Sequence, residues 1–82
     1  MTVSLKIYDL SVPEDLRNLT LELSDGSTVE NLAYECVGID GLPYTYENII
    51  GSAILVNSSL AAPATTLNDG DKVIIMRPME GG

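Results

Sequence analysis

Residues 17–38, RNLTLELSDGSTVENLAYECVG, contain a change from the periodicity of a strand to that of a helix. Leu19, Leu21 and Leu23 alternate with polar residues, which predicts a half-buried strand over residues 17–24. Asp25-Gly26 then predicts a turn. A short helix follows, which Gly38 ends, and its apolar residues share one face: Val29, Leu32, Ala33 and Cys36.

The start of this helix carries a capping motif. Ser27-Thr28-Val29-Glu30 has the form of a capping box, with Ser27 as the N-cap and Glu30 reaching back to it. Thr28 can serve as the N-cap instead, and the spacing does not choose between the two.

The rest of the chain predicts a sheet for this helix to cover. Residues 2–8 alternate and form an antiparallel hairpin with residues 17–24, across a connection at residues 9–15. Residues 53–57 are a short buried strand, and residues 72–77 are an apolar strand suited to the centre of a mixed sheet. The pattern predicts an α+β fold, a mixed sheet with one helix packed across it, which is the shape called a β-grasp. Less regular segments complete it: a helical turn near Tyr46–Ile50, a loop over Ser58–Thr66, and a turn at Asn68–Asp71.

Composition excludes several functions. The 82 residues fit one domain, with 4 Lys and Arg against 12 Asp and Glu, so the net charge is 4 − 12 = −8. Without His and with one Cys, the chain cannot build a zinc finger, a Ser-His-Asp triad or an internal disulfide. We expect no nucleic-acid partner, because the clustered cations that bind phosphates are missing. We expect no membrane partner and a cytoplasmic location, because no long apolar run or signal peptide is seen.

The sequence ends in Gly81-Gly82, which is its most informative feature. Glycine has no Cβ, so this pair can enter a slot too narrow for other residues and leaves the terminal carboxylate sterically open. Such a carboxylate becomes an electrophile once ATP has adenylated it. Taken alone, two glycines are also compatible with a frayed end.

The segment around these glycines resembles a known family. Leu67-Asn68-Asp69-Gly70-Asp71-Lys72-Val73, followed by Arg77-Pro78-Met79-Glu80-Gly81-Gly82, resembles the C-terminal third of the MoaD/ThiS-type sulfur carriers. These include the small subunit of molybdopterin synthase and the carrier of the thiamine pathway. Ser27–Leu32 is similar to the start of the family helix, and Ile54-Leu55-Val56-Asn57 to the end of a family strand. The resemblance implies a ubiquitin-like β-grasp fold.

The resemblance also implies a mechanism. An E1-like enzyme would use ATP to adenylate the Gly82 carboxylate, and a sulfur donor would convert it to a thiocarboxylate. A sulfur-accepting large subunit or synthase would then use that sulfur, with molybdopterin biosynthesis favoured over the thiamine pathway. The chain is thus expected to be a co-substrate and not an enzyme, with no cofactor of its own. The alternatives are a ubiquitin-like protein modifier and a β-grasp subunit that only binds.

The same resemblance assigns roles to the end of the chain. It divides the sequence into a β-grasp domain, residues 1–78, and a flexible Gly-Gly tail, residues 79–82. Gly82 is the activated residue, and Gly81, Glu80 and Met79 enter the partner's channel. Pro78 and Met76 are expected to contact the partner. Glu80 stands where family tails carry a small or apolar residue, so it repels the ATP phosphates unless a partner Lys or Arg meets it.

Other candidate residues have a structural explanation beside the functional one. Cys36 is predicted to be a buried, unreactive thiol, because it lies on the apolar stripe of the helix. Tyr44 and Tyr46 are expected to cover one edge of the core, and with Tyr34 they form an alternative binding patch. Asp69 and Asp71 predict a turn in preference to a metal site.

The distribution of charge along the chain suggests a further role. No Lys or Arg occurs between Arg17 and Lys72. We expect the acidic surface to steer the protein towards basic rims on its partners, which would make association depend on ionic strength.

Overall fold

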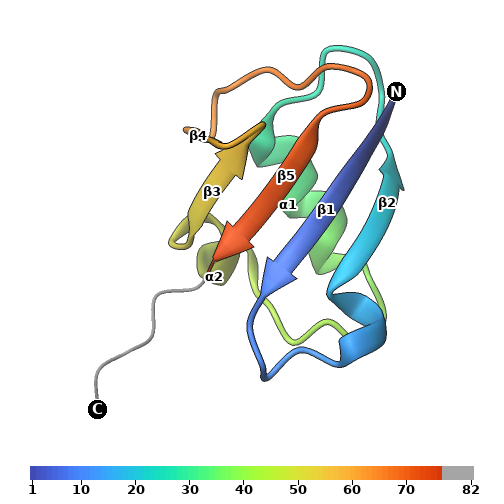
Figure 1. Ribbon diagram of the computed structural model, residues 1–82, viewed down its shortest axis with the longest axis vertical. Helices are drawn as coiled ribbons and strands as arrows, with labels where there is room; N and C mark the ends of the chain where they lie inside the picture. The colour runs from blue at the N-terminus through green and yellow to red at the C-terminus, as the bar shows by residue number, and fades with distance from the viewer. Residues whose placement is uncertain (77–82) are drawn as a thin grey trace.

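The computed structural model describes residues 1–76, and its framework is a five-stranded mixed sheet (Figure 1). The strands lie in the order β2-β1-β5-β3-β4, with β5 parallel to β1 and antiparallel to β3. The last strand is therefore central, as its β-branched residues predict. The bounds of the strands are β1 Thr2–Tyr8, β2 Asn18–Glu22, β3 Ala53–Val56, β4 Ser59–Leu60 and β5 Lys72–Met76.

One helix covers one face of this sheet. α1, Val29–Val37, runs behind the strands in Figure 1. Its apolar stripe is fully buried, and so are the side chains that β1 and β5 direct toward it, namely Val3, Leu5, Ile7, Val73 and Ile75. Two shorter helices are present as well, the 3₁₀ helix Glu14–Leu16 and α2, Tyr46–Ile50, whose Ile49 is buried in the core. The β-grasp prediction and the helical turn at Tyr46–Ile50 are both confirmed.

The segment predicted as a loop over Ser58–Thr66 begins with a strand. β4 pairs with β3 through Leu55 with Leu60 and Val56 with Ser59. The two residues between these strands, Asn57 and Ser58, have φ of 50° and 72°. Positive φ at both central residues is typical of a two-residue hairpin turn, and Asn tolerates this conformation better than most residues. The prediction missed β4 because it is only two residues long.

The helix cap is Thr28, one of the two residues that the sequence left open, and its reciprocal partner is Asn31 and not Glu30. The Thr28 hydroxyl accepts a hydrogen bond from Asn31 N at 3.3 Å, and Thr28 N donates to Asn31 Oδ1 at 2.9 Å. Thr28 also forms a β-bridge with Thr66, which holds it in an extended conformation. Ser27 instead donates to Ser24 O at 2.7 Å, and Glu30 accepts from the Tyr46 hydroxyl at 3.1 Å.

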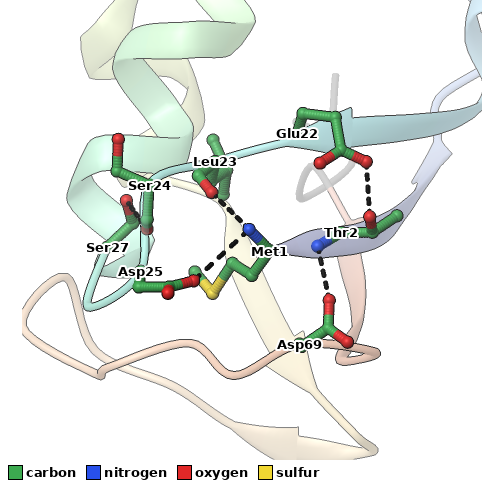
Figure 2. A network of polar contacts seen from close by, with 8 residues as sticks. All are labelled: Met1, Thr2, Glu22, Leu23, Ser24, Asp25, Ser27 and Asp69. Carbon is green, nitrogen blue, oxygen red and sulfur yellow. Dashed lines mark hydrogen bonds and ion pairs between the residues drawn. The ribbon is translucent and has the colours of Figure 1, made fainter.

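Met1 and Thr2, at the start of the chain, contact the turns at Asp25 and at Asp69 at one end of the sheet (Figure 2). The Met1 amine donates to Leu23 O at 2.7 Å and lies 3.4 Å from the Asp25 carboxylate. Thr2 N donates to the Asp69 carboxylate at 2.7 Å, and the Thr2 hydroxyl donates to Glu22. These contacts anchor the start of β1. β1 and β5 are parallel and both end at the opposite end of the sheet, and the C-terminal segment follows β5 in the sequence.

Candidate functional site

The central strand ends at Met76, the last residue that the structure describes. In the register of the sheet, Met76 lies between Tyr8 on β1 and Ala53 on β3. Hydrogen-bonded neighbours on both sides and the buried side chains of Val73 and Ile75 hold this strand in place. The predicted site residues Pro78, Met79, Glu80, Gly81 and Gly82 lie outside the described residues, as does the boundary between residues 78 and 79.

The face of the sheet opposite α1 presents an apolar area beside Met76. The side chain of Met76 is 41% exposed, that of Tyr8 51% and that of Leu60 77%. Ile74 and Leu55 pair with each other between them and are half-buried. We call these five residues the apolar half of the open face. An exposed apolar area at the end of the central strand is suited to contact with another protein.

Sequence reasoning found only Met76 in this area. The alternation of residues 2–8 places Tyr8 on the outward side, which was a usable signal. Leu60 could not be found in the same way, because its place opposite Leu55 depends on the hairpin turn at Asn57 and Ser58. The five residues of the apolar half are neighbours only because of the order of the strands in the sheet.

A second feature fixes the start of β5. Asp71 is 8% exposed, and its carboxylate accepts hydrogen bonds from Asn68 N at 2.8 Å and Asn57 Nδ2 at 2.9 Å. Asn57 Oδ1 in turn accepts from Lys72 N at 3.0 Å. Asp69 lies in the turn and binds Thr2 N, and Gly70 there has φ of 84°, which favours glycine. The turn predicted for Asp69 and Asp71 is confirmed, whereas the part of Asn57 was missed.

Cys36 lies in the core, as its place on the helix predicts. Its side chain is 0% exposed. Burial, with a smaller contribution from the Glu35 charge, raises the pKa of the Cys36 thiol to about 12. At neutral pH it is a protonated thiol without access to solvent, which is the opposite of a reactive cysteine.

The tyrosines divide between the core and the surface. Tyr44 is 5% exposed and donates its hydroxyl proton to Asp9, so it covers an edge of the core as predicted. Tyr46 is half-buried against the core and stacks on the exposed Tyr34, with ring centroids 4.5 Å apart. This stacked pair lies on α1 and α2 and not at the end of β5, so it is separate from the area around Met76.

Known proteins resemble this chain in sequence and in structure. A sequence model described as the ThiS family matches residues 10–82. No curated protein sequence matches the chain. The match covers the apolar helix, the turn before β5 and the terminal Gly-Gly, and so includes all three segments that resemble the family.

Three solved structures share the fold. A Pyrococcus furiosus protein provisionally assigned as molybdopterin converting factor subunit 1 has a TM-score of 0.76 at 22% identity, covering 95% of this chain and 98% of its own. A chain from the complex of molybdopterin-converting factor subunits 1 and 2 of Helicobacter pylori 26695 has 0.69 at 24% identity, covering both chains fully. Small archaeal modifier protein 1 of Haloferax volcanii has 0.71 at 19% identity, covering 95% and 98%. These similarities establish a ubiquitin-like β-grasp fold.

Among residues 1–76, no three His, Cys, Asp or Glu side chains gather closely enough to hold a metal ion. No helix in this part of the chain has the length and apolar character needed to cross a membrane.

Proposed function

Since the chain belongs to the ThiS family of small ubiquitin-like sulfur carriers, we propose that Gly82 is the residue on which it carries sulfur. The observation that carries this proposal is the family match, which extends to Gly82. The fold supports it as well, because the central strand ends at Met76, beside an exposed apolar area.

The proposed chemistry has two steps, and both take place on a partner enzyme. In the first, a Gly82 carboxylate oxygen attacks the α-phosphorus of ATP, which releases pyrophosphate and leaves an acyl-adenylate. In the second, hydrosulfide or an equivalent sulfur donor attacks the acyl carbon, AMP leaves, and the loss of one proton gives the thiocarboxylate. The carrier supplies no acid or base, which suits a sequence without His.

We place the sulfur acceptor in molybdopterin biosynthesis. Two proteins that share the fold are described as molybdopterin converting factor components, and one of them forms a complex of subunits 1 and 2. By analogy, a larger second subunit would receive the end of this chain. Met76 and Pro78 would contact that subunit, while Met79, Glu80 and Gly81 would lie in its channel.

Intact mass spectrometry tests the proposal directly. The purified chain is incubated with ATP, an E1-like activating enzyme and sulfide, and its mass is compared before and after. We expect a gain equal to one oxygen replaced by sulfur, located on Gly82 and lost in a variant that lacks this residue. A mass that does not change, with an enzyme shown to be active on its own carrier, would contradict the proposal.

A second candidate function is protein modification. The fold is shared with a small archaeal modifier protein, and a lysine amine can attack the same acyl-adenylate to form an amide with loss of AMP. Digestion of a cell extract followed by peptide mass spectrometry separates the two. Lysines that carry a glycine remnant from this chain indicate modification, whereas thiocarboxylate without such adducts indicates a carrier only.

A further inference from the structure

Within residues 1–76, the edge of the sheet at β2 has no strand on its outer side. β2 pairs with β1 alone, and Figure 1 shows it as the outer strand. Ile7 N donates to Arg17 O at 2.8 Å. Leu23 N likewise donates to Met1 O at 2.8 Å. Because hydrogen-bonded and non-hydrogen-bonded pairs alternate along an antiparallel ladder, every second residue of β2 directs its peptide group away from β1. These residues are Asn18, Thr20 and Glu22.

The outward peptide groups of these three residues are open to a new partner. No group of residues 1–76 forms a hydrogen bond with them. On the side of the sheet that faces α1, Leu19 and Leu21 contact the core but are only half-buried, since no strand covers their outer side. A free strand edge beside half-buried leucines is a template for the addition of another strand.

Acidic side chains surround this edge. A groove of about 440 Å³ lies between the end of β2 and α1, and three carboxylates line it, those of Glu22, Asp25 and Glu35. At the other end of β2, Glu14 and Asp15 are exposed on the 3₁₀ helix. Arg17 precedes β2, but its guanidinium donates to main-chain carbonyl oxygens at 2.8 Å and 3.3 Å. The edge therefore lies in a region of negative charge.

This charge decides which kind of strand can occupy the edge. Two copies of the chain that paired through β2 would bring the same carboxylates together, and each copy carries a net charge of −8. Acidic residues at a strand edge thus oppose pairing between identical chains. The same residues attract a strand that carries positive charge.

We propose that β2 binds an extended segment of another protein, in which alternate residues are apolar and Lys or Arg residues stand at both ends. The peptide groups of this segment would pair with those of Asn18, Thr20 and Glu22. Its apolar side chains would cover Leu19 and Leu21, and its cationic ends would meet the carboxylates at the two ends of β2.

This contact is separate from the proposed chemistry. β1 lies between β2 and β5, the strand that ends at Met76. Binding at β2 is therefore independent of sulfur on Gly82. Its test needs no activating enzyme, so a failure of either proposal leaves the other standing.

The first experiment identifies the segments that bind and locates them on the chain. A library of random peptides displayed on phage is selected against the whole chain. We expect the selected peptides to alternate apolar residues and to carry Lys or Arg on both sides. Synthetic peptides of these sequences are then added while amide hydrogen exchange is followed by NMR. Exchange at Asn18, Thr20 and Glu22 should slow by about tenfold or more, because each outward N–H gains an acceptor.

Variants test the backbone and the charge separately. Thr20→Pro removes one outward N–H at a position where an edge strand tolerates proline, and should weaken peptide binding about fivefold. Glu22→Lys/Glu35→Lys changes the net charge from −8 to −8 + 4 = −4 and should weaken binding about tenfold at about 0.15 M NaCl. Asp40→Lys/Glu47→Lys gives the same net charge at exposed positions outside the groove, and should stay within about twofold of the original chain.

The inference is overturned if no peptide is selected, if the selected peptides have no excess of Lys and Arg, or if exchange slows only outside β2. Equal binding by the two charge-reversed chains would overturn it as well. A dimer of the original chain in analytical ultracentrifugation, with the same three amides protected, would assign the edge to a second copy. Circular dichroism checks that each variant is folded. If Thr20→Pro is not, the two charge-reversed chains still decide the outcome.

Discussion

The pKa of the Cys36 thiol is determined by the surroundings of this side chain. It lies on the buried face of α1 with no exposed surface. The thiolate would be a charge without water around it, and for this reason its pKa is about 12 in place of the ordinary 9.0. Sequence position predicted the burial correctly, because the residue falls on the stripe formed by Val29, Leu32 and Ala33. The size of the pKa change depends on the packed neighbours, which the stripe alone does not specify.

This difference in pKa makes stability depend on pH. Between about pH 9 and pH 12 the unfolded chain loses the thiol proton while the folded chain keeps it, so the free energy of unfolding falls as pH rises. The loss should be about 2 kcal/mol at about pH 10.5. Urea unfolding of the original chain and of Cys36→Ala over this range measures it. The stability advantage of the original chain should shrink as pH rises, and an advantage that stays constant would contradict the raised pKa.

At the scale of the element, the residue at which α1 begins is determined by contacts with a segment that is distant in the sequence. Ser27 and Thr28 both fit a capping pattern, and local sequence does not distinguish them. Val29 N donates to Thr65 O at 2.9 Å, and Thr28 bridges to Thr66. These contacts hold Thr28 extended, which is the conformation of an N-cap. The choice of cap therefore depends on residues more than thirty positions away, and the local sequence could not decide between Ser27 and Thr28.

The two candidate caps give a direct comparison of stability. Thr28→Ala removes the acceptor for Asn31 N and should lower the free energy of unfolding by about 1 kcal/mol. Ser27→Ala removes only the hydrogen bond to Ser24 O in an exposed turn, and should cost less than about half of that. Chemical unfolding monitored by circular dichroism measures both. A larger loss from Ser27→Ala would assign the cap to Ser27 after all.

The hairpin turn at Asn57 and Ser58 shows which kind of element could not be predicted from the sequence. Strands of four residues or more, and both α-helices, were predicted because periodicity and capping residues act locally. β4 is too short to show a period, and it follows from the left-handed backbone of Asn57 and Ser58. The same turn brings Asn57 to Asp71, fourteen residues away. Contacts of this kind depend on the assembled sheet and leave little trace in the sequence.

Across the whole molecule, the strand order brings two lysines onto one face. The order β2-β1-β5-β3-β4 places Lys6 and Lys72 on the open face, where Glu22 also lies, while Glu30, Glu35 and Glu47 lie on the helices. Net charge and its distribution along the chain were readable from the sequence, as was the central place of residues 72–77. The apolar half of the open face was not, because it combines residues from four strands. The tail was assigned through family resemblance and not through any physical pattern of its own.

This excess of negative charge should make the folded state sensitive to salt. With a net charge of −8, repulsion among the carboxylates opposes compaction, and screening relieves it. We expect the free energy of unfolding to rise by on the order of 1 kcal/mol between low salt and about 0.2 M NaCl.

The size of this salt response should follow the net charge across three proteins: Glu35→Gln/Glu47→Gln at −6, the original chain at −8, and Ala62→Glu/Ala64→Glu at −10. All four positions are exposed, so these changes leave the core intact. Urea unfolding at each salt concentration measures the response. If the three proteins responded equally, local ion pairs or general salt effects would have to explain the stabilisation, and self-repulsion of the whole molecule would not.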